Sequence, residues 1–244
     1  MRFSLTESDR FKLNVYREII EDGDIDIHTI KTEVERNKID LLILRINSSL
    51  KSINYKLTEL PYDVIHCDNL VYYQCDLKKH ISTDLLNELL FIPFSLEHIP
   101  VLKTIIPIIF NNYKNHYFSN PIINKENIVD GYIEWMINNI IDEHYSENLW
   151  LVFNADNEVV GFAKCNYNKA ESYCEGLLYG VLPNFSNKGI YTDLIRFTKN
   201  HYREIGIDTM KVSTQLTNYS VQRVWVKEKF NLSHSYDTYH INIY

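Results

Sequence analysis

The sequence predicts an α/β protein in which helices and strands are mixed in layers. First, helical stretches with apolar residues three or four apart alternate with short β-branched runs. Second, the order from residue 86 onward is strand, helix, helix, three strands, helix, strand, helix, strand. Third, the 244 residues are 45% hydrophobic and 23% charged, which is typical of a globular chain with a real core.

The N-terminal part predicts a small α/β unit. Residues 1–35 are charged and have a helical pattern throughout. A strand-like run follows at 40–46, and a short helical stretch is expected at 49–60. Apolar and polar residues then alternate over 62–77, which predicts a second strand.

A polar segment at 78–84 predicts a boundary between a small subdomain, 1–82, and a larger domain, 83–244. The elements expected in the larger domain are a strand ending near Phe94, helices at 96–113 and 125–142, a hairpin at 148–168, a strand at 172–183, a helix at 190–206, a strand at 208–215, a helix at 218–230 and a last strand or hairpin at 232–244.

Charge argues against nucleic-acid binding and for a small-molecule partner. The formal net charge is −7, and lysine and arginine are spread along the chain without a basic block. The apolar region 85–110 is interrupted by charged residues and prolines, so we expect no membrane span. The N-terminal residues lack the apolar run of a signal peptide, so we expect a cytoplasmic protein.

The cysteines predict neither disulfides nor a metal site. None of them forms a CxxC pair, and no cysteine or histidine has zinc-type spacing. We therefore expect reduced thiols at all four positions, which are Cys67, Cys75, Cys165 and Cys174.

The turn "SNKGIY" at 186–191 has the features of an anion-binding site. It lies between an expected strand and an expected helix, where unpaired N–H groups and the positive end of the helix dipole converge. Gly189 can adopt a positive φ, and Lys188 adds a charge. Gly176 and Gly180 lie inside the preceding strand and indicate a bulge or a close backbone approach there.

The segments "GLLYGVLPNFSNKGIYTDLIRF" and "VSTQLTNYSVQRVWVKEKFNLSHSY" resemble the two cofactor motifs of the GNAT superfamily of N-acetyltransferases. "FIPFSLEHIPVLKTI" resembles that family's first strand and helix. The resemblance implies a mixed, mostly antiparallel sheet with a splayed central strand flanked by helices. It also implies acetyl-CoA as cofactor, with its pyrophosphate on Ser186, Asn187, Lys188, Gly189, Ile190 and Tyr191, and further contacts from Leu178, Tyr179, Gly180, Val181, Asn218 and Trp225.

Trp225 departs from the family pattern. Many members place there, seven residues after the asparagine that corresponds to Asn218, a tyrosine that protonates the departing thiolate. An indole N–H is not a useful acid near neutral pH, but a thiolate leaves well without full protonation. A nearby phenol could substitute, and the candidates are Tyr219, Tyr191 and Tyr239.

Three segments also resemble bacterial nucleotide-sugar N-acetyltransferases of the dTDP-fucosamine type. They are "HYFSNPIINKENIVDGYIEWMINNI", "VSTQLTNYSVQRVWVKEKF" and "SYDTYHINIY". This resemblance implies a nucleotide-linked amino sugar as acceptor, in the synthesis of cell-surface polysaccharide such as lipopolysaccharide O-antigen. A homodimer is a further expectation.

Attack by an amine on the thioester requires loss of a proton from the alkylammonium. The candidate bases are Glu175, on the strand before the turn, and His240, on the last strand. The expected acceptor-binding residues are mostly aromatic and comprise His116, Tyr117, Phe118, Tyr132, Trp135, Gln215 and Tyr239.

Other functions remain open at this point. The acceptor could instead be an amino acid, a polyamine, an aminoglycoside or a protein N-terminus. The chain could also bind coenzyme A without catalysis, because it lacks the usual tyrosine and has Lys229 where the family has glycine before Phe230.

Overall fold

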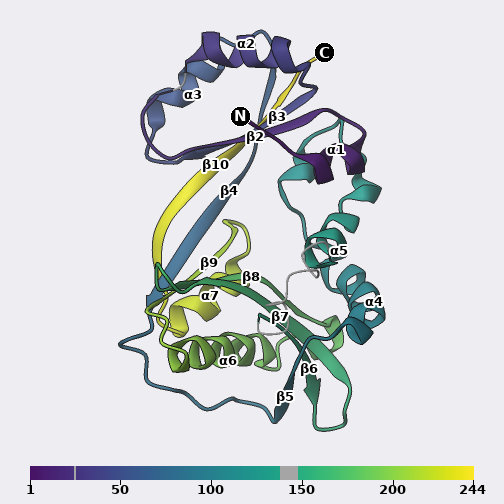
Figure 1. Cartoon of the computed structure of the whole chain (residues 1–244), viewed down its shortest axis with the longest axis vertical. Helices are drawn as coiled ribbons and strands as arrows, with labels where there is room; N and C mark the ends of the chain where they lie inside the picture. The colour runs from purple at the N-terminus through teal and green to yellow at the C-terminus, as the bar shows by residue number, and fades with distance from the viewer. Residues whose placement is uncertain (25, 138–147) are drawn as a thin grey trace. The chain divides into compact units, whose positions relative to one another are not determined.

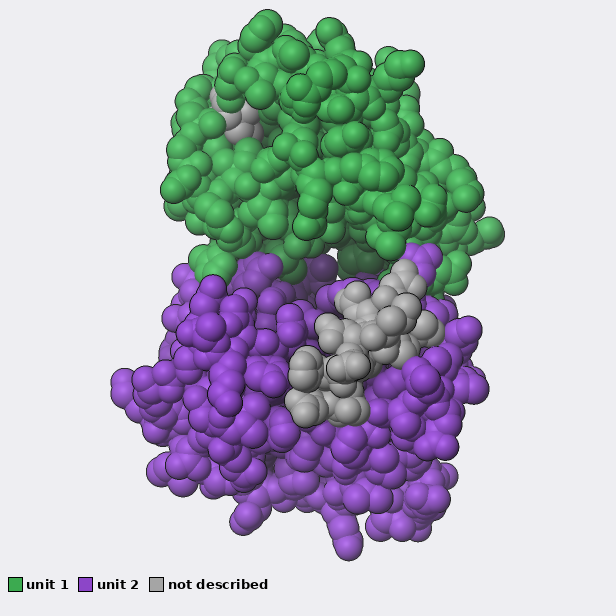
Figure 2. Space-filling view, in the orientation of Figure 1, with its two compact units in different colours: residues 1–71, 114–131, 234–244 green, residues 72–113, 132–233 purple. Residues whose placement is uncertain are grey.

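A computed structural model of the chain describes residues 1–24, 26–137 and 148–244 (Figure 1). The chain divides into two compact units, and each unit is built from several segments (Figure 2). Unit 1 comprises 1–71, 114–131 and 234–244. Unit 2 comprises 72–113 and 132–233, of which 138–147 lie outside the described residues.

Unit 1 contains a mixed sheet in which β2 and β3 are parallel and β3 and β10 are antiparallel. Hydrophobic residues of α2 and α3 pack with β3 into one core cluster. The elements of this unit are β1 (Arg2–Phe3), α1 (Leu5–Phe11), β2 (Val15–Ile20), α2 (Ile27–Asn37), β3 (Leu41–Asn47), α3 (Lys51–Leu57), the first part of β4 (Asp63–Asp76), the single turn η2 (His116–Ser119) and most of β10 (Asn231–Asn242).

The helical expectation for residues 1–35 is wrong at Val15–Ile20, which form strand β2. This segment pairs along its whole length with β3, and Val15 is fully buried. Its sequence, "VYREII", is rich in β-branched and aromatic residues, so local propensity favours the strand. The expected strands at 40–46 and 62–77 and the helix between them are confirmed.

Unit 1 differs from the expected subdomain 1–82 because it includes two later segments. Tyr117, Ile123 and Ile128 lie in one core cluster with Val15 and Leu41, which anchors 114–131 to the N-terminal strands. Strand β10 pairs with β3 over seven residue positions, from Tyr236 to Asn242.

Unit 2 has the order of elements that the sequence predicts. Neighbouring strands β5 to β8 are antiparallel, and β8 is parallel to β9. The elements are β5 (Leu89–Pro93), α4 (Ile99–Phe110), α5 (Asp130–Ile137), β6 (Leu149–Asn154), β7 (Val159–Asn168), β8 (Tyr173–Val181), α6 (Ile190–Glu204), β9 (Thr209–Gln215) and α7 (Tyr219–Lys227). The last part of the helix expected at 125–142 lies outside the described residues.

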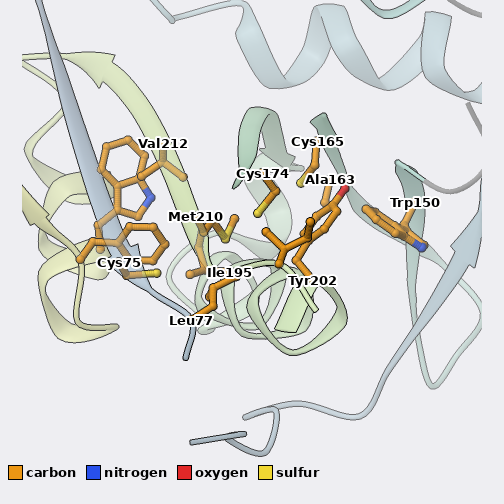
Figure 3. Packing of buried hydrophobic residues seen from close by; sticks show 13 residues of the cluster. Cys75, Leu77, Trp150, Ala163, Cys165, Cys174, Ile195, Tyr202, Met210 and Val212 are labelled. Carbon is orange, nitrogen blue, oxygen red and sulfur yellow. The ribbon is translucent and has the colours of Figure 1, made fainter. Parts of the chain in front are cut away.

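Side chains alternate between the two faces of the unit 2 sheet. Residues such as Leu151 and Phe162 pack with α4 in one cluster. Their neighbours Trp150 and Ala163 pack on the opposite face with Ile195 of α6 and Trp225 of α7. Figure 3 shows part of this second cluster, where Cys165, Cys174 and Tyr202 gather between strands and helix.

This layered arrangement, with helices on both faces of a mixed sheet, confirms the predicted fold class. Among the described residues, no helix is long and apolar enough to cross a membrane.

Candidate functional site

Strand β8 bulges and then separates from β9. Gly176 pairs with Cys165 of β7, whereas the next paired residue, Leu178, lies opposite Lys164, so that Leu177 is an extra residue. Pairing between β8 and β9 stops at the same place, at Gly176 and Val212. The rest of β8, up to Val181, therefore has one backbone edge that does not pair with β9. This is the splayed strand that the glycines predicted.

The loop after β8 has the geometry of an anion nest. Asn187 has a φ of 62° and Gly189 a φ of 83°, and α6 begins at Ile190 without a side-chain cap. Within the described part of the chain, the N–H groups of residues 187–191 donate to no protein group. These donors and the helix dipole make a site for a diphosphate.

A segment before β5 holds the nest in place. The fully buried carboxylate of Asp193 accepts hydrogen bonds from the backbone N–H groups of Leu86 (2.6 Å) and Asn87 (3.1 Å). The Asn87 amide also donates to the carbonyl of Lys188, at 3.0 Å. A Cβ added to Gly189 would meet Leu86 Cδ1 at 3.0 Å, so a larger residue there would require the Leu86 side chain to shift by a few tenths of an ångström.

The Tyr191 side chain points into the protein, towards α7. Its ring packs edge-on against Tyr179, with centroids 6.1 Å apart, and burial raises the pKa of its hydroxyl. The indole N–H of Trp225 lies near this hydroxyl but makes no hydrogen bond to it. Trp225 is 2% exposed, so its N–H is a buried donor that no protein group satisfies.

Polar groups also gather at the C-terminal end of β9. The Tyr113 hydroxyl donates to Gln215 Oε1 and lies 3.3 Å from Thr214 Oγ1. Asn218 sits at the N-cap of α7 but makes no side-chain cap. Its amide donates to Thr214 Oγ1 at 3.0 Å instead, and its carbonyl oxygen accepts from Ser220.

Two of the catalytic candidates lie in unit 2. Glu175 is in the paired part of β8, opposite Asn166 and Lys211, one residue before Gly176. Tyr219 begins α7 and is 59% exposed.

The third catalytic candidate, His240, lies in unit 1, and both its ring nitrogens have protein partners. Nε2 is 2.7 Å from His116 Nδ1, and Nδ1 is 2.9 Å from the Asn120 amide. The ring is fully buried, and burial, with a smaller effect of Arg17, lowers its pKa to about 3. This environment keeps the ring neutral and favours a structural role.

The expected acceptor-binding residues divide between the units. Tyr117, Phe118 and Tyr239 belong to unit 1, where the Tyr239 hydroxyl donates to Asn54 at 2.9 Å. In unit 2, Tyr132 stacks on Phe110 with centroids 4.5 Å apart.

Trp135 of α5 is 41% exposed. Its carbonyl accepts a 2.9 Å hydrogen bond from Lys164 Nζ, and burial lowers the pKa of this lysine to about 8.

Sequence reasoning did not identify Tyr113, Asp193 or Lys164. Asp193 carries a usable signal, because it is an acidic residue in the first turn of an amphipathic helix, yet it is fully buried. Tyr113 follows a helix and Lys164 lies in a β-rich run, and neither pattern distinguishes them from packing residues.

The residues of unit 2 fit coenzyme A. The nest supplies unpaired amides for a diphosphate, the splayed edge of β8 supplies amides for an extended chain, and Trp225 supplies an unsatisfied donor.

The sequence matches one protein-family model over part of its length. Residues 113–230 match the family model described as Acetyltransferase (GNAT) family. Residues 113–230 are therefore similar to the GNAT acetyltransferase family, and the fold agrees with this similarity. No curated protein matches the sequence.

Solved structures share the fold at low identity. A GCN5-related N-acetyltransferase from Sphaerobacter thermophilus has a TM-score of 0.61 and 12% identity over 82% of this chain, which spans 59% of that one. A conserved protein of unknown function from Staphylococcus epidermidis ATCC 12228 has a TM-score of 0.61 and 13% identity, covering 99% of this chain and 90% of its own. A glucosamine N-acetyltransferase region of a fungal multi-domain β-N-acetylglucosaminidase has a TM-score of 0.61 and 9% identity. The match covers 81% of this chain and 25% of that one.

Proposed function

We propose that the chain is an acetyl-CoA-dependent N-acetyltransferase whose cofactor binds at the nest and at the splayed edge of β8. The observation that carries this proposal is the combination of the unpartnered N–H groups of residues 187–191 with the unpaired edge of β8 beyond Gly176. A cofactor with a diphosphate at one end and an amide-bearing arm at the other matches both the nest and the unpaired strand edge.

When bound, acetyl-CoA supplies an acetyl group activated as a thioester. Residues Ser186 to Tyr191 hold the diphosphate through their backbone, and Lys188 adds a positive charge beside it. The amides of Leu178 to Val181, with Asn218 at the head of α7, line the arm. An unpaired N–H on this part of β8 polarises the reacting carbonyl.

Trp225 takes the place of the usual tyrosine. We infer that its buried N–H donates a hydrogen bond to the sulfur of coenzyme A, which stabilises a thiolate without transferring a proton. The hydroxyl of Tyr191 lies beside the indole, but burial raises its pKa and so makes it a weaker acid. Tyr219 is exposed at the surface.

For the acceptor amine we propose Glu175 as the base that removes its proton. Glu175 lies on β8 close to the bulge and alternates with Cys174, whose side chain is in the cluster with α6. The Glu175 side chain therefore points to the opposite face, which α4 covers. His240 is less suited because its ring nitrogens are both occupied.

As acceptor we propose the amino group of a nucleotide-linked amino-deoxy sugar. Two lines of reasoning support it: the resemblance of three segments to nucleotide-sugar N-acetyltransferases, and the glucosamine N-acetyltransferase region among the similar structures. Of the expected acceptor-binding residues, Tyr132, Trp135 and Gln215 lie in unit 2 with the cofactor nest and are the ones we propose; His116, Tyr117, Phe118 and Tyr239 belong to unit 1.

Two experiments test the proposal. Acetyl-CoA at millimolar concentration should raise the melting temperature, and no shift would contradict the cofactor site. A thiol-release assay should then show turnover with amino-sugar nucleotides and not with polyamines, amino acids or aminoglycosides. Turnover only with another amine would refute the sugar. Binding without turnover on any amine would indicate a coenzyme A-binding protein.

A further inference from the structure

Unit 1 contains a row of buried polar side chains that the proposed acetyl transfer does not use. Asn120 and Asn242 exchange two side-chain hydrogen bonds, at 2.8 and 3.1 Å. The Asn120 amide is 2.9 Å from His240 Nδ1, and His240 Nε2 is 2.7 Å from His116 Nδ1. At the far end of the row, His116 Nε2 lies 3.5 Å from Arg17 Nη2.

A backbone donor fixes the orientation of the first side chain in this row. The N–H of Ile122 donates to Asn120 Oδ1 at 3.2 Å, and a backbone N–H can donate a hydrogen bond but cannot accept one. Oδ1 is therefore an acceptor, and the opposite atom of the amide, which faces His240, is the NH₂ group.

The proton positions of both histidines follow from this orientation. Burial is the main cause that lowers the pKa of each ring, so both are neutral and each carries one proton. Since Nδ1 of His240 accepts from Asn120, its proton is on Nε2 and is donated to His116 Nδ1. The proton of His116 is therefore on Nε2.

Two donors consequently face each other at the end of the row. His116 Nε2–H and Arg17 Nη2 are 3.5 Å apart, and an arginine can only donate. The row begins with a donor at Ile122 and ends with a donor at Arg17, so no choice of neutral tautomers can supply the missing acceptor. Protonating either ring would add another donor.

The carboxylate that pairs with Arg17 has other hydrogen-bond donors. Glu7 is 4% exposed and accepts from the hydroxyl groups of Tyr117 and Ser4. It also pairs with Arg17 through Nε, at 3.3 Å, which leaves Nη2 on the side of His116. The Arg17 side chain is 27% exposed, whereas His116 is 4% exposed.

We propose that Arg17 Nη2 and His116 Nε2 together bind an anionic oxygen, supplied by a carboxylate or a phosphate group. One oxygen between them accepts from both donors and completes the hydrogen bonds of the row. The positive charge of Arg17 favours an anion over a neutral acceptor. This proposal does not depend on acetyl transfer, because every residue in it belongs to unit 1.

The test uses the full-length protein labelled with ¹⁵N at its histidines. Long-range ¹H–¹⁵N spectra should show His116 and His240 as neutral rings with the proton on Nε2. Titration with inorganic phosphate, and separately with acetate, should shift the Nε2–H signal of His116 to saturation. The anion that saturates this signal at the lower concentration identifies the source of the oxygen. An unprotonated Nε2 on His116, or signals unchanged by both anions, would overturn the proposal and leave water as the occupant.

A pair of variants provides an independent readout. Arg17→Gln should weaken phosphate or acetate binding by about tenfold or more, the loss expected for a charge-assisted hydrogen bond. Arg36→Gln is the control, because Arg36 pairs with Glu33 on an exposed helix face. Equal affinity in Arg17→Gln and Arg36→Gln would overturn the site. If Arg17→Gln does not fold, the wild-type titration decides alone.

Discussion

Replacing Trp225 by phenylalanine tests the proposal that its indole N–H donates a hydrogen bond to the sulfur of coenzyme A. The change keeps an aromatic ring in the core between Tyr73 and the unit 2 sheet and removes only the indole N–H with part of the ring. In the free protein this N–H has no partner, so no hydrogen bond is lost there. In the proposed complex it donates to the sulfur, and the variant is expected to lose that bond.

The expected magnitude follows from the cost of a hydrogen bond to a charged group. Such a bond contributes about 1.5–3 kcal/mol, so coenzyme A should bind Trp225→Phe roughly tenfold or more weakly. Part of any loss of affinity will come from repacking of the core. Desulfo-coenzyme A lacks the sulfur, so the affinity that the variant loses for it measures the effect of repacking alone.

Calorimetric titration of wild type and variant with both ligands measures the interaction as a coupling. We expect the variant to lose affinity for coenzyme A and to bind desulfo-coenzyme A nearly as wild type does. Trp150→Phe is the matched control, since Trp150 belongs to the same core cluster. Equal losses for the two ligands would refute the role of the indole, and no binding of either ligand to wild type would refute the cofactor site itself.

Four further predictions concern the nest and the buried titratable groups. Gly189→Ala should weaken acetyl-CoA binding at least about fivefold, because a left-handed alanine costs roughly 1–2 kcal/mol. Gly206→Ala has the same φ of 83° but open space around it, so it should lower the melting temperature and leave affinity unchanged. Asp193→Asn should lower the free energy of unfolding by about 1–3 kcal/mol in urea titrations, since it weakens hydrogen bonds to a buried carboxylate. The native His240 ring stays neutral with a pKa of about 3, while the unfolded ring takes up a proton below its ordinary pKa. His240 alone should therefore contribute a loss of stability of about 1.4 kcal/mol for each unit by which the pH falls below roughly 6.5, and the total loss should be less steep in His240→Gln. Burial raises the pKa of the buried thiols above that of the unfolded chain, so stability should also fall as pH rises above roughly 8.5, and a flat alkaline profile would contradict this for Cys75, Cys165 and Cys174.

The fold of unit 2 could be predicted because its signals are local. Gly176 precedes the bulge, Gly180 lets Phe162 and Ile109 approach the strand, and Gly189 adopts the positive φ before α6. The apolar spacing of each helix and the hairpin turn also lie within short windows of sequence.

Other features depend on contacts between distant segments. Strand β2 has charged neighbours that resemble a helical pattern, and it forms a strand because β3 offers a parallel partner. His116 meets Arg17 across 99 positions of sequence, and Asn120 meets His240 across 120. A single sequence carries no signal for such pairs, so His240 was expected to be a base and not part of a buried row.

The orphaned indole illustrates the same limit. The sequence identifies Trp225 as a departure from the family pattern but does not show that its N–H is buried without a partner. The geometry therefore changes the question from which acid replaces the tyrosine to which ligand atom satisfies the indole.

Backbone amide mapping tests the central claim most directly. In ¹H–¹⁵N spectra of the full-length protein, acetyl-CoA should cause its largest shifts at the amides of 187–191, which donate to no protein group in the described part of the chain, and along 178–181, where β8 has an edge that does not pair with β9. In Gly189→Ala the same shifts should require higher concentrations. Shifts confined to other residues, or unchanged spectra at millimolar acetyl-CoA, would contradict the cofactor site and the function proposed from it.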